Sequence, residues 1–407
     1  LVGSEMCIRD RHNVYKCRRG GNMKKEIIVF VSNVLIVFFG VGIILNTAPL
    51  YKGTAAAAAG NIVSASMPYT NLKDSAQQVF SYFSDNSENT ADNNSTSSED
   101  ASEVMHSVSS KDSLSVDELK ATPDDILKLM EEEEKVIGSQ TKKGNTSEES
   151  YTGGGAIVTF ENVQVQNKIP NDFYSLNIEE LLNQKADLKI SDPSQPTVLI
   201  YHSHSTECYT LLDAGYYTES TDSKTKDITR NMVRVGDEIC KILEERGIGV
   251  IHDREIHDTS YNAAYDSSRK SVVEYLEKYP SIEITIDVHR DSITYKDGTK
   301  VKPTAVVNDK KAAKMMIISG CEYGSVKNFP NWEYNLRFAC AVTDKLNSLY
   351  PDLMRPVLFS ERKYNMDLTK NSFLLEIGTD ANTLEEACYS GRLFANTLAD
   401  LIYEEYS

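Results

Sequence analysis

From Gly155 onward, short apolar runs alternate with amphipathic segments, and this alternation limits the possible folds more than any other feature of the chain. Apolar runs of strand length that are separated by amphipathic helices form parallel sheets with helices packed on both faces. We therefore expect residues 155–407 to form an α/β domain with a mainly parallel, twisted sheet. The predicted strands are 156–165, 197–202, 248–253, 282–289, 304–309, 314–320 and 373–378, and the predicted helices are 178–184, 227–247, 260–279, 331–350 and 383–406.

Residues 27–45 are almost all Ile, Val, Leu or Phe. Their length matches the hydrocarbon core of a bilayer, which favours an uncleaved, single-pass transmembrane helix over a signal peptide that is removed. The basic leader 1–26 then lies in the cytoplasm and the rest of the chain outside it. A run of small residues at 53–60 leaves cleavage as the alternative. Because Met23 resembles a translational start, we expect residues 1–22 to be non-native.

Residues 46–154 lie between this predicted anchor and the predicted α/β domain. The part from 84 to 110 has almost no apolar side chains and cannot bury enough surface to offset the chain entropy lost on folding. An amphipathic segment with good helix caps follows at 115–138. We expect the whole region to be a low-complexity, extracytoplasmic stalk with a disordered tether, so that the folded domain begins at residue 155.

The net charge of -17 argues against a nucleic-acid partner, because binding to phosphate backbones requires clustered Lys and Arg. The seven cysteines are scattered and form no CxxC pattern. They indicate neither a disulfide framework nor a cysteine metal site.

Three predicted strands end in side chains that can bind a metal ion. Because the carboxyl ends of parallel strands meet at one edge of a sheet, these side chains are expected to lie together. Two His and one carboxylate, with a further Glu as a base, make up the usual donor set of hydrolytic zinc sites. The carboxylate within "FLLEIG" also requires a cationic partner if it is buried. The candidate residues are His202, His204, Glu207, His289 and Glu376.

The same segments carry a family resemblance. "FLLEIGTDANTLEEA" is similar to the closing motif of zinc N-acetylmuramoyl-alanine amidases, in which a catalytic Glu is followed by a Gly at plus two and an Asn at plus six. Gly378 and Asn382 match those two positions. In addition, "VQNKIPNDFYSLNIEELL", "LIYHSHSTECY", "NMVRVGDEI" and "DVHRDS" occur in the order found in the stage II sporulation protein P family, which they resemble over about residues 157–402.

The resemblance implies a membrane-anchored peptidoglycan hydrolase with an amidase-like catalytic domain at 155–407. Such an enzyme cuts the bond between N-acetylmuramic acid and L-alanine, with an additional endopeptidase activity, and remodels the septal wall during engulfment in sporulation. The resemblance also implies that the stage II sporulation proteins D and M are partners and that Zn²⁺ is the cofactor.

Carried over residue by residue, the resemblance implies Glu376 as the catalytic residue and His289 as the second histidine ligand. His204 is the first ligand, with His202 as the alternative. Glu207 is the best candidate for the third ligand, because the amidases keep a Glu where this chain has Asp227 and Ile228. Arg290 and Asn382 are expected to bind substrate, and Arg230 or Arg234 are further candidates for orienting the stem peptide.

Two other functions fit the same residues. A different zinc peptidase or a deacetylase acting on the wall would use the same ligands. A non-catalytic wall-binding scaffold is the alternative outside enzymes, although a degenerate site has no use for a buried acid such as Glu376.

Overall fold

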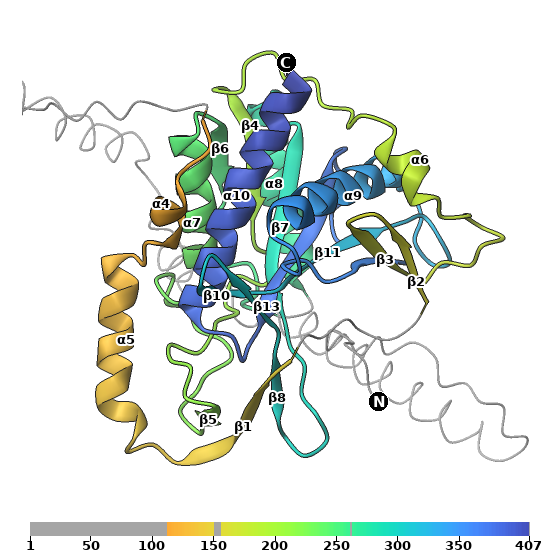
Figure 1. Ribbon diagram of the computed structural model, residues 1–407. Helices are drawn as coiled ribbons and strands as arrows, with labels where there is room; N and C mark the ends of the chain where they lie inside the picture. The colour runs from red at the N-terminus through yellow and green to blue at the C-terminus, as the bar shows by residue number, and fades with distance from the viewer. Residues whose placement is uncertain (1–111, 150–155, 261–262, 407) are drawn as a thin grey trace, which may run out of the picture. The chain divides into compact units, whose positions relative to one another are not determined.

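The computed structural model describes residues 112–149, 156–260 and 263–406. The predicted leader, membrane span and disordered tether all lie outside these ranges. Within them, the central element is an eight-stranded sheet with the order β2-β3-β12-β11-β13-β7-β4-β6 (Figure 1). Its strands are β2 (Ile157–Phe160), β3 (Val163–Asn167), β4 (Pro196–Tyr201), β6 (Gly249–His252), β7 (Ile284–Asp291), β11 (Met315–Gly320), β12 (Val357–Ser360) and β13 (Ser372–Thr379).

The sheet is mixed rather than uniformly parallel. Strands β6, β4, β7 and β13 pair in parallel, and so do β11, β12 and β3, but β11 runs antiparallel to β13. The single strand expected at 156–165 is instead the hairpin β2–β3, with Glu161 in the left-handed region at a φ of 47°. The α/β class is confirmed, and the antiparallel step separates the parallel strands β3, β12 and β11 from the parallel strands β13, β7, β4 and β6.

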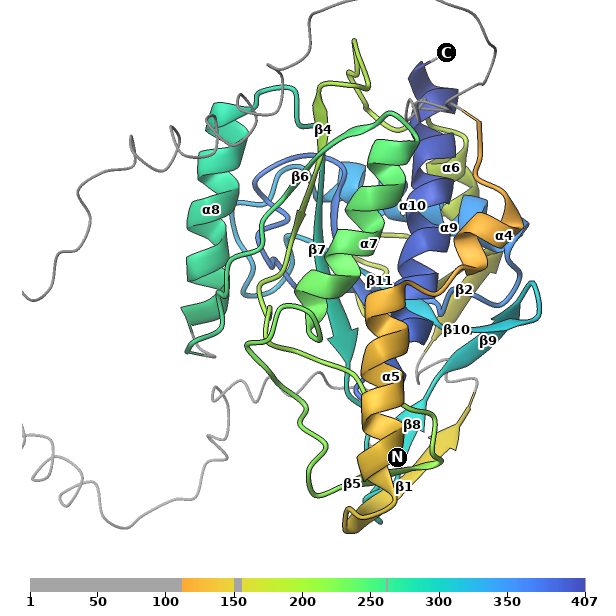
Figure 2. The same cartoon turned by 90° about the vertical axis from the view of Figure 1, so that its left-hand side faces the viewer.

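Helices cover both faces of the sheet, as the alternation of apolar residues in β4 requires. Val198 and Ile200 join the main hydrophobic core, whereas Leu199 and Tyr201 pack on the other face with Val272. Figure 2 shows α7, α9 and α10 on the first side and α8 alone on the second. The bounds are α6 (Ile178–Leu182), α7 (Met232–Glu245), α8 (Ala264–Lys278), α9 (Trp332–Leu349) and α10 (Leu384–Tyr406).

Residues 116–148 pack on the α/β body, which differs from the stalk that was expected up to residue 154. Leu119 and Ile126 are buried in the main core. The apolar stripe of this segment is visible in the sequence, but nothing local indicates which surface it covers. The elements are α4 (Val116–Lys120), α5 (Asp124–Ile137) and β1 (Lys142–Glu148), and β1 forms a small sheet with β5 (Tyr216–Thr218) and β8 (Lys300–Lys302).

A chain of ion pairs also holds α5 to the body. Asp125 Oδ2 lies 2.8 Å from Arg234 Nε, and Arg234 Nη1 lies 2.7 Å from Glu238 Oε1. Glu238 in turn lies 3.0 Å from Arg392 of α10. Because Glu238 and Arg392 are buried, removing either partner would leave an uncompensated charge inside the protein.

We expect Ile126→Ala to lower the free energy of unfolding by about 2–5 kcal/mol, the usual cost of emptying a buried aliphatic site. Leu127→Ala is the matched control, because Leu127 is the next residue in the same helix and is 42% exposed. Urea denaturation of both variants measures the difference. Equal stability of the two variants would show that α5 does not belong to the folded core.

Two smaller elements complete the fold. Strands β9 (Thr304–Val307) and β10 (Lys310–Ala313) form a hairpin beside α10.

Among the described residues, no helix combines the length and the apolar character needed to cross a membrane.

Candidate metal centre

Strands β7 and β13 place a histidine and a glutamate side by side at the centre of the sheet. Their parallel register pairs His289 with Glu376. Their neighbours Val288 and Leu375 belong to the main core under α7, α9 and α10. Because side chains alternate along a strand, His289 and Glu376 therefore lie on the face that carries α8. Each is only 1% exposed.

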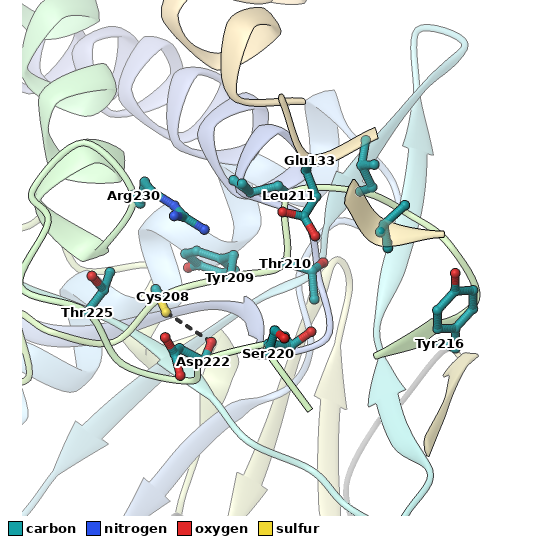
Figure 3. A pocket seen from close by; sticks show the side chains of 13 residues that line it. Glu133, Cys208, Tyr209, Thr210, Leu211, Tyr216, Ser220, Asp222, Thr225 and Arg230 are labelled. Carbon is teal, nitrogen blue, oxygen red and sulfur yellow. Dashed lines mark hydrogen bonds between the residues drawn. The ribbon is translucent and has the colours of Figure 1, made fainter. Parts of the chain in front are cut away.

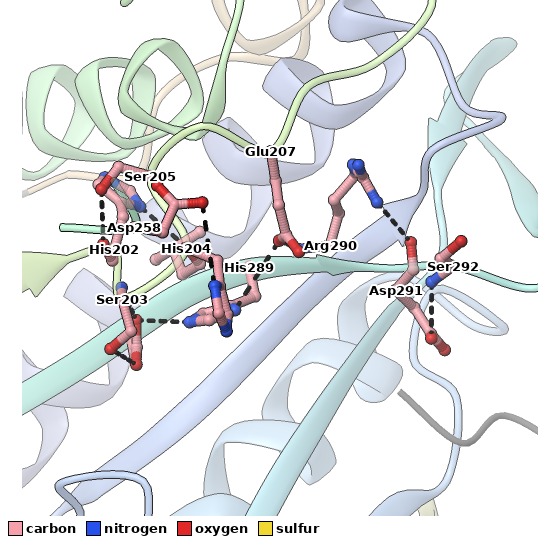
Figure 4. A network of polar contacts seen from close by, with 12 residues as sticks. His202, Ser203, His204, Ser205, Glu207, Asp258, His289, Arg290, Asp291 and Ser292 are labelled. Atoms are coloured by element: carbon pink, nitrogen blue, oxygen red, sulfur yellow. Dashed lines mark hydrogen bonds and ion pairs between the residues drawn. The ribbon is translucent and has the colours of Figure 1, made fainter. Parts of the chain in front are cut away.

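The loop after β4 brings the remaining candidates to this point (Figure 4). The Ser203 amide and hydroxyl both donate to the Asp287 carboxylate, which anchors the loop to β7. The His204 ring then lies 5.4 Å from the His289 ring, nearly perpendicular to it. Glu207 Oε2 lies 3.8 Å from His289 Nδ1. Thus His204, Glu207, His289 and Glu376 converge.

His202 is turned away from this cluster. Its Nδ1 lies 2.9 Å from the Val288 carbonyl oxygen, and its Nε2 lies 2.9 Å from His252 Nε2. The opposite nitrogen of His252, Nδ1, lies 3.1 Å from Asp237. Burial, followed by the neighbouring His252, lowers the pKa of His202 to about 3. These contacts give His202 a bracing role under the loop, and His204 stays the candidate for the first ligand.

The two imidazoles meet only because residue 236 of α7 is a glycine. A Cβ at Gly236 would lie 2.4 Å from His252 Nε2 and 2.5 Å from His202 Nε2. We expect Gly236→Ala to cost about 1–3 kcal/mol of stability through this overlap. The matched control is Gly391→Ala in α10, where the nearest atom would lie 3.2 Å away. Thermal denaturation compares the two, and equal melting temperatures would contradict the close approach.

The ionisable groups of the cluster have strongly shifted pKa values. Burial and then the Asp291 carboxylate raise the pKa of Glu376 well above its usual range. Burial alone would lower the pKa of His289, but Asp287 at 2.7 Å from Nε2, with Glu207 and Glu376, raises it to about 9. Burial lowers the pKa of His204 to about 4. The carboxylates around His289 thus form an electronegative site.

His289 and Glu207 have a spacing that fits a zinc ion, whereas the donor atoms of His204, Glu207 and His289 do not all lie within 4.8 Å of one another. Ligands of tetrahedral zinc lie about 2.0–2.2 Å from the ion, and hence about 3.3–3.5 Å from each other, close to the His289–Glu207 separation. Asp287 stands behind His289, as the outer carboxylate does in many histidine–metal sites. Glu376 Oε2 is buried and accepts no hydrogen bond from the described part of the chain. A divalent cation would therefore compensate charges that the surrounding protein leaves unpaired.

Arg290 and Asn382 brace the backbone, which differs from the substrate-binding role that was predicted for them. The Arg290 guanidinium donates to the carbonyl oxygens of Cys208, Ser223 and Asp291. The Asn382 amide oxygen accepts from the Thr379 amide, and its nitrogen donates to Glu386. Asn382 is fully buried and closes the turn at Gly378, whose φ is +64°.

Two neighbours of the cluster were not predicted. Asp287 lies two residues before His289, so the period of a strand places both on one face and could have identified it. The Tyr265 ring of α8 lies 5.4 Å from the His204 ring and 6.4 Å from the His289 ring. No local pattern distinguishes this tyrosine from the others.

A second group of possible ligands lies nearby. The donor atoms of Asp253, Glu255 and His257 are within 4.8 Å of one another. However, His257 already contacts Asp253 through one ring nitrogen and Ser267 through the other. Internal hydrogen bonds thus account for the His257 ring and Asp253, and the group supports the loop through the bond from the His257 amide to Ser205.

Comparisons with known proteins agree on one family. The family model described as stage II sporulation protein P matches residues 63–399. The stage II sporulation protein P of Bacillus subtilis (strain 168) is 31% identical over 247 residues, which cover 56% of this chain and 57% of that relative. The match therefore spans a little over half the length of this curated relative.

Solved amidase structures also resemble the chain. The N-acetylmuramoyl-L-alanine amidase AmiC2 of Nostoc punctiforme is 12% identical, covers 53% of this chain and 97% of its own, and gives a TM-score of 0.30. The CwlD amidase from Clostridioides difficile, solved in complex with the GerS lipoprotein, is also 12% identical. It covers 52% of this chain and 100% of its own, with a TM-score of 0.31.

Proposed function

The chain belongs to the stage II sporulation protein P family, and on this premise we propose that it is a zinc-dependent peptidoglycan hydrolase. The bond cut is the amide between N-acetylmuramic acid and L-alanine. The observation that supports this best is the convergence of two histidines and a carboxylate beside a second, buried carboxylate with an elevated pKa. This is the layout of hydrolytic zinc sites.

In this proposal His204, Glu207 and His289 hold the metal. When bound, Zn²⁺ supplies Lewis-acid polarisation of the scissile carbonyl and lowers the pKa of a bound water from about 15.7 to about 7. Asp287 keeps His289 oriented with its Nδ1 toward the site. A metal ligand must be a neutral imidazole, so His289, whose pKa its carboxylate neighbours raise, would give up a proton when a metal ion bound.

Glu376 acts as the general base and then the general acid. It takes the proton of the attacking water and delivers it to the departing amine of L-alanine. A carboxylate with a raised pKa suits both steps, because it accepts a proton more readily than an ordinary glutamate and still releases it near neutral pH. The buried acid would have no purpose in a wall-binding scaffold.

The cellular part of the proposal follows from the family and from residues 27–45. We propose that these residues anchor the chain in the cell membrane, with the hydrolase outside it. There it would remodel septal peptidoglycan during engulfment in sporulation, together with the stage II sporulation proteins D and M. An additional endopeptidase activity on peptide cross-links belongs to the same proposal.

Digestion of purified peptidoglycan tests the function. The protein should include all residues from at least 112, because Leu119 and Ile126 form part of the core. We expect bound zinc near one equivalent by elemental analysis, and stem peptides with a free L-alanine amine by mass spectrometry. Release of other fragments alone would favour a zinc peptidase or deacetylase. Zinc-loaded protein that releases nothing from the wall would refute the hydrolase proposal.

A further inference from the structure

A cavity of about 200 Å³ lies between α5 and the segment that follows Glu207 (Figure 3). One wall begins at Cys208 and Tyr209, the residues directly after the predicted metal ligand. Glu133 and Ile137 of α5 close the opposite side. The packing of α5 on the α/β body thus supplies one side of the cavity.

The cavity is close enough to the metal centre to hold another part of the same substrate. Cys208 pairs with Asn231 in an antiparallel bridge, and Arg230 is the next residue along. Bridge and chain spacings then place the Arg230 Cα within about 13 Å of the Glu207 Cα. Three residues of extended peptide span at most about 11 Å, to which the side chains add their own reach.

The charged groups of the cavity are of both signs. Arg230 is exposed, and its guanidinium has no hydrogen-bond or ion-pair partner in the described ranges. In Figure 3 it points toward Tyr209 and Leu211. The carboxylates of Glu133 and Asp222 lie on other walls. Arg234, the other arginine considered for substrate binding, is fully engaged by Asp125 and Glu238.

One guanidinium and two carboxylates suit a ligand that carries a carboxylate together with an ammonium group. Arginine binds carboxylates with planar, charge-assisted hydrogen bonds. Glu133 and Asp222 would repel a purely anionic ligand, but they attract an amine. In the stem peptide of peptidoglycan, the residue with both groups is the diamino acid at the third position.

We propose that this cavity is a subsite for the diamino-acid residue of the stem peptide, with Arg230 binding its carboxylate and Glu133 with Asp222 binding its free amine. This inference rests on the proposed hydrolase function and specifies its substrate. For the amidase reaction, it also makes the enzyme selective for stems whose side-chain amine is free, that is, stems that do not use this amine in a cross-link.

Steady-state kinetics with three matched substrates test the subsite. All are N-acetylmuramoyl tripeptides: one has a free amine and carboxylate on the diamino acid, one has that amine acetylated, and one has that carboxylate amidated. For Arg230→Gln we expect KM for the unmodified substrate to rise about tenfold to a hundredfold, the usual effect of losing a charge-assisted hydrogen bond. The value of kcat should stay within about twofold, because Arg230 does not touch the reacting bond.

The pattern across substrates separates a specific contact from a general defect. Arg230→Gln should no longer distinguish the amidated substrate, and Glu133→Gln should no longer distinguish the acetylated one. Lys226→Gln and Glu132→Gln are the matched controls, since both side chains are exposed and neither lines the cavity. If all four variants keep the wild-type preference for the unmodified substrate, or if the wild type has no preference, the subsite does not exist.

Equilibrium binding distinguishes this inference from the proposed function. The same three tripeptides are titrated into zinc-loaded protein and into its Arg230→Gln variant by calorimetry, under conditions without turnover. Tighter binding of the unmodified tripeptide that Arg230→Gln abolishes would support the subsite even if no bond were cut. Cleavage by the wild type without any such difference in binding would overturn the subsite and leave the hydrolase intact.

Discussion

Glu376→Gln is expected to lower kcat for peptidoglycan hydrolysis by about 10²–10⁴-fold, the contribution of a positioned general acid–base group. Glutamine is nearly isosteric but cannot accept the proton of the attacking water. It also removes a buried carboxylate whose charged form is disfavoured by burial and by Asp291. The melting temperature should therefore be equal to or higher than that of the wild type. Release of soluble wall fragments and thermal denaturation measure both effects.

Zinc content separates a lost base from a lost metal. Because Glu376 is assigned to the proton transfers, the variant should still bind about one equivalent. Glu361→Gln is a suitable control, since this acid bonds to Ser325 at the surface, away from the cluster. A Glu376→Gln enzyme that hydrolyses the wall at the wild-type rate would remove the assigned base. A variant that loses its zinc would make Glu376 a ligand instead.

Replacing each histidine of "HSH" with alanine in turn should have opposite effects on zinc affinity and on protein stability. His204→Ala is expected to weaken zinc binding by more than the 10–100-fold typical of outer-shell changes, and to abolish hydrolysis with it. His202→Ala should keep zinc within that range but destabilise the protein, because it leaves His252 facing a cavity beside Gly236.

Competition with a chromophoric chelator gives the zinc affinities, and urea denaturation of the metal-free proteins gives the stabilities. The metal-free measurement matters because ligand binding itself stabilises the folded state. If His202→Ala loses the metal and His204→Ala keeps it, then the loop has a different arrangement in the zinc-bound protein and His202 is the ligand.

The sequence predicts the centre of the sheet well. The strands expected at 197–202, 282–289 and 373–378 match β4, β7 and β13 to within two residues at each end. The first and third are largely apolar runs and the second alternates apolar with polar residues, both of which are typical of strands. Strand direction is not encoded in such a run. The antiparallel pairing of β11 with β13 therefore could not be predicted, and neither could the packing of α5.

The candidate site was predictable as a set of residues but not in its details. Strand ends locate His289 and Glu376, since the sheet itself places them together. His202 and His204 are both close to the end of β4, and the contacts that separate them come from His252 and Gly236, far along the chain. Arg290 and Asn382 carry polar groups that suit a substrate, yet their backbone partners exist only in the folded protein.

The shared ladder of β7 and β13 has a consequence for how the centre could be opened. His289 and Glu376 are held in register by main-chain hydrogen bonds in the middle of the sheet, whereas His204 and Glu207 sit on a connection secured by side chains such as Ser203. The ion would then enter or leave the site by movement of the loop that carries His204 and Glu207, while His289 and Glu376 stay in place on their strands. Chelators should consequently extract the metal at a rate set by the loop, and substitutions at Ser203 should accelerate extraction without shifting the base.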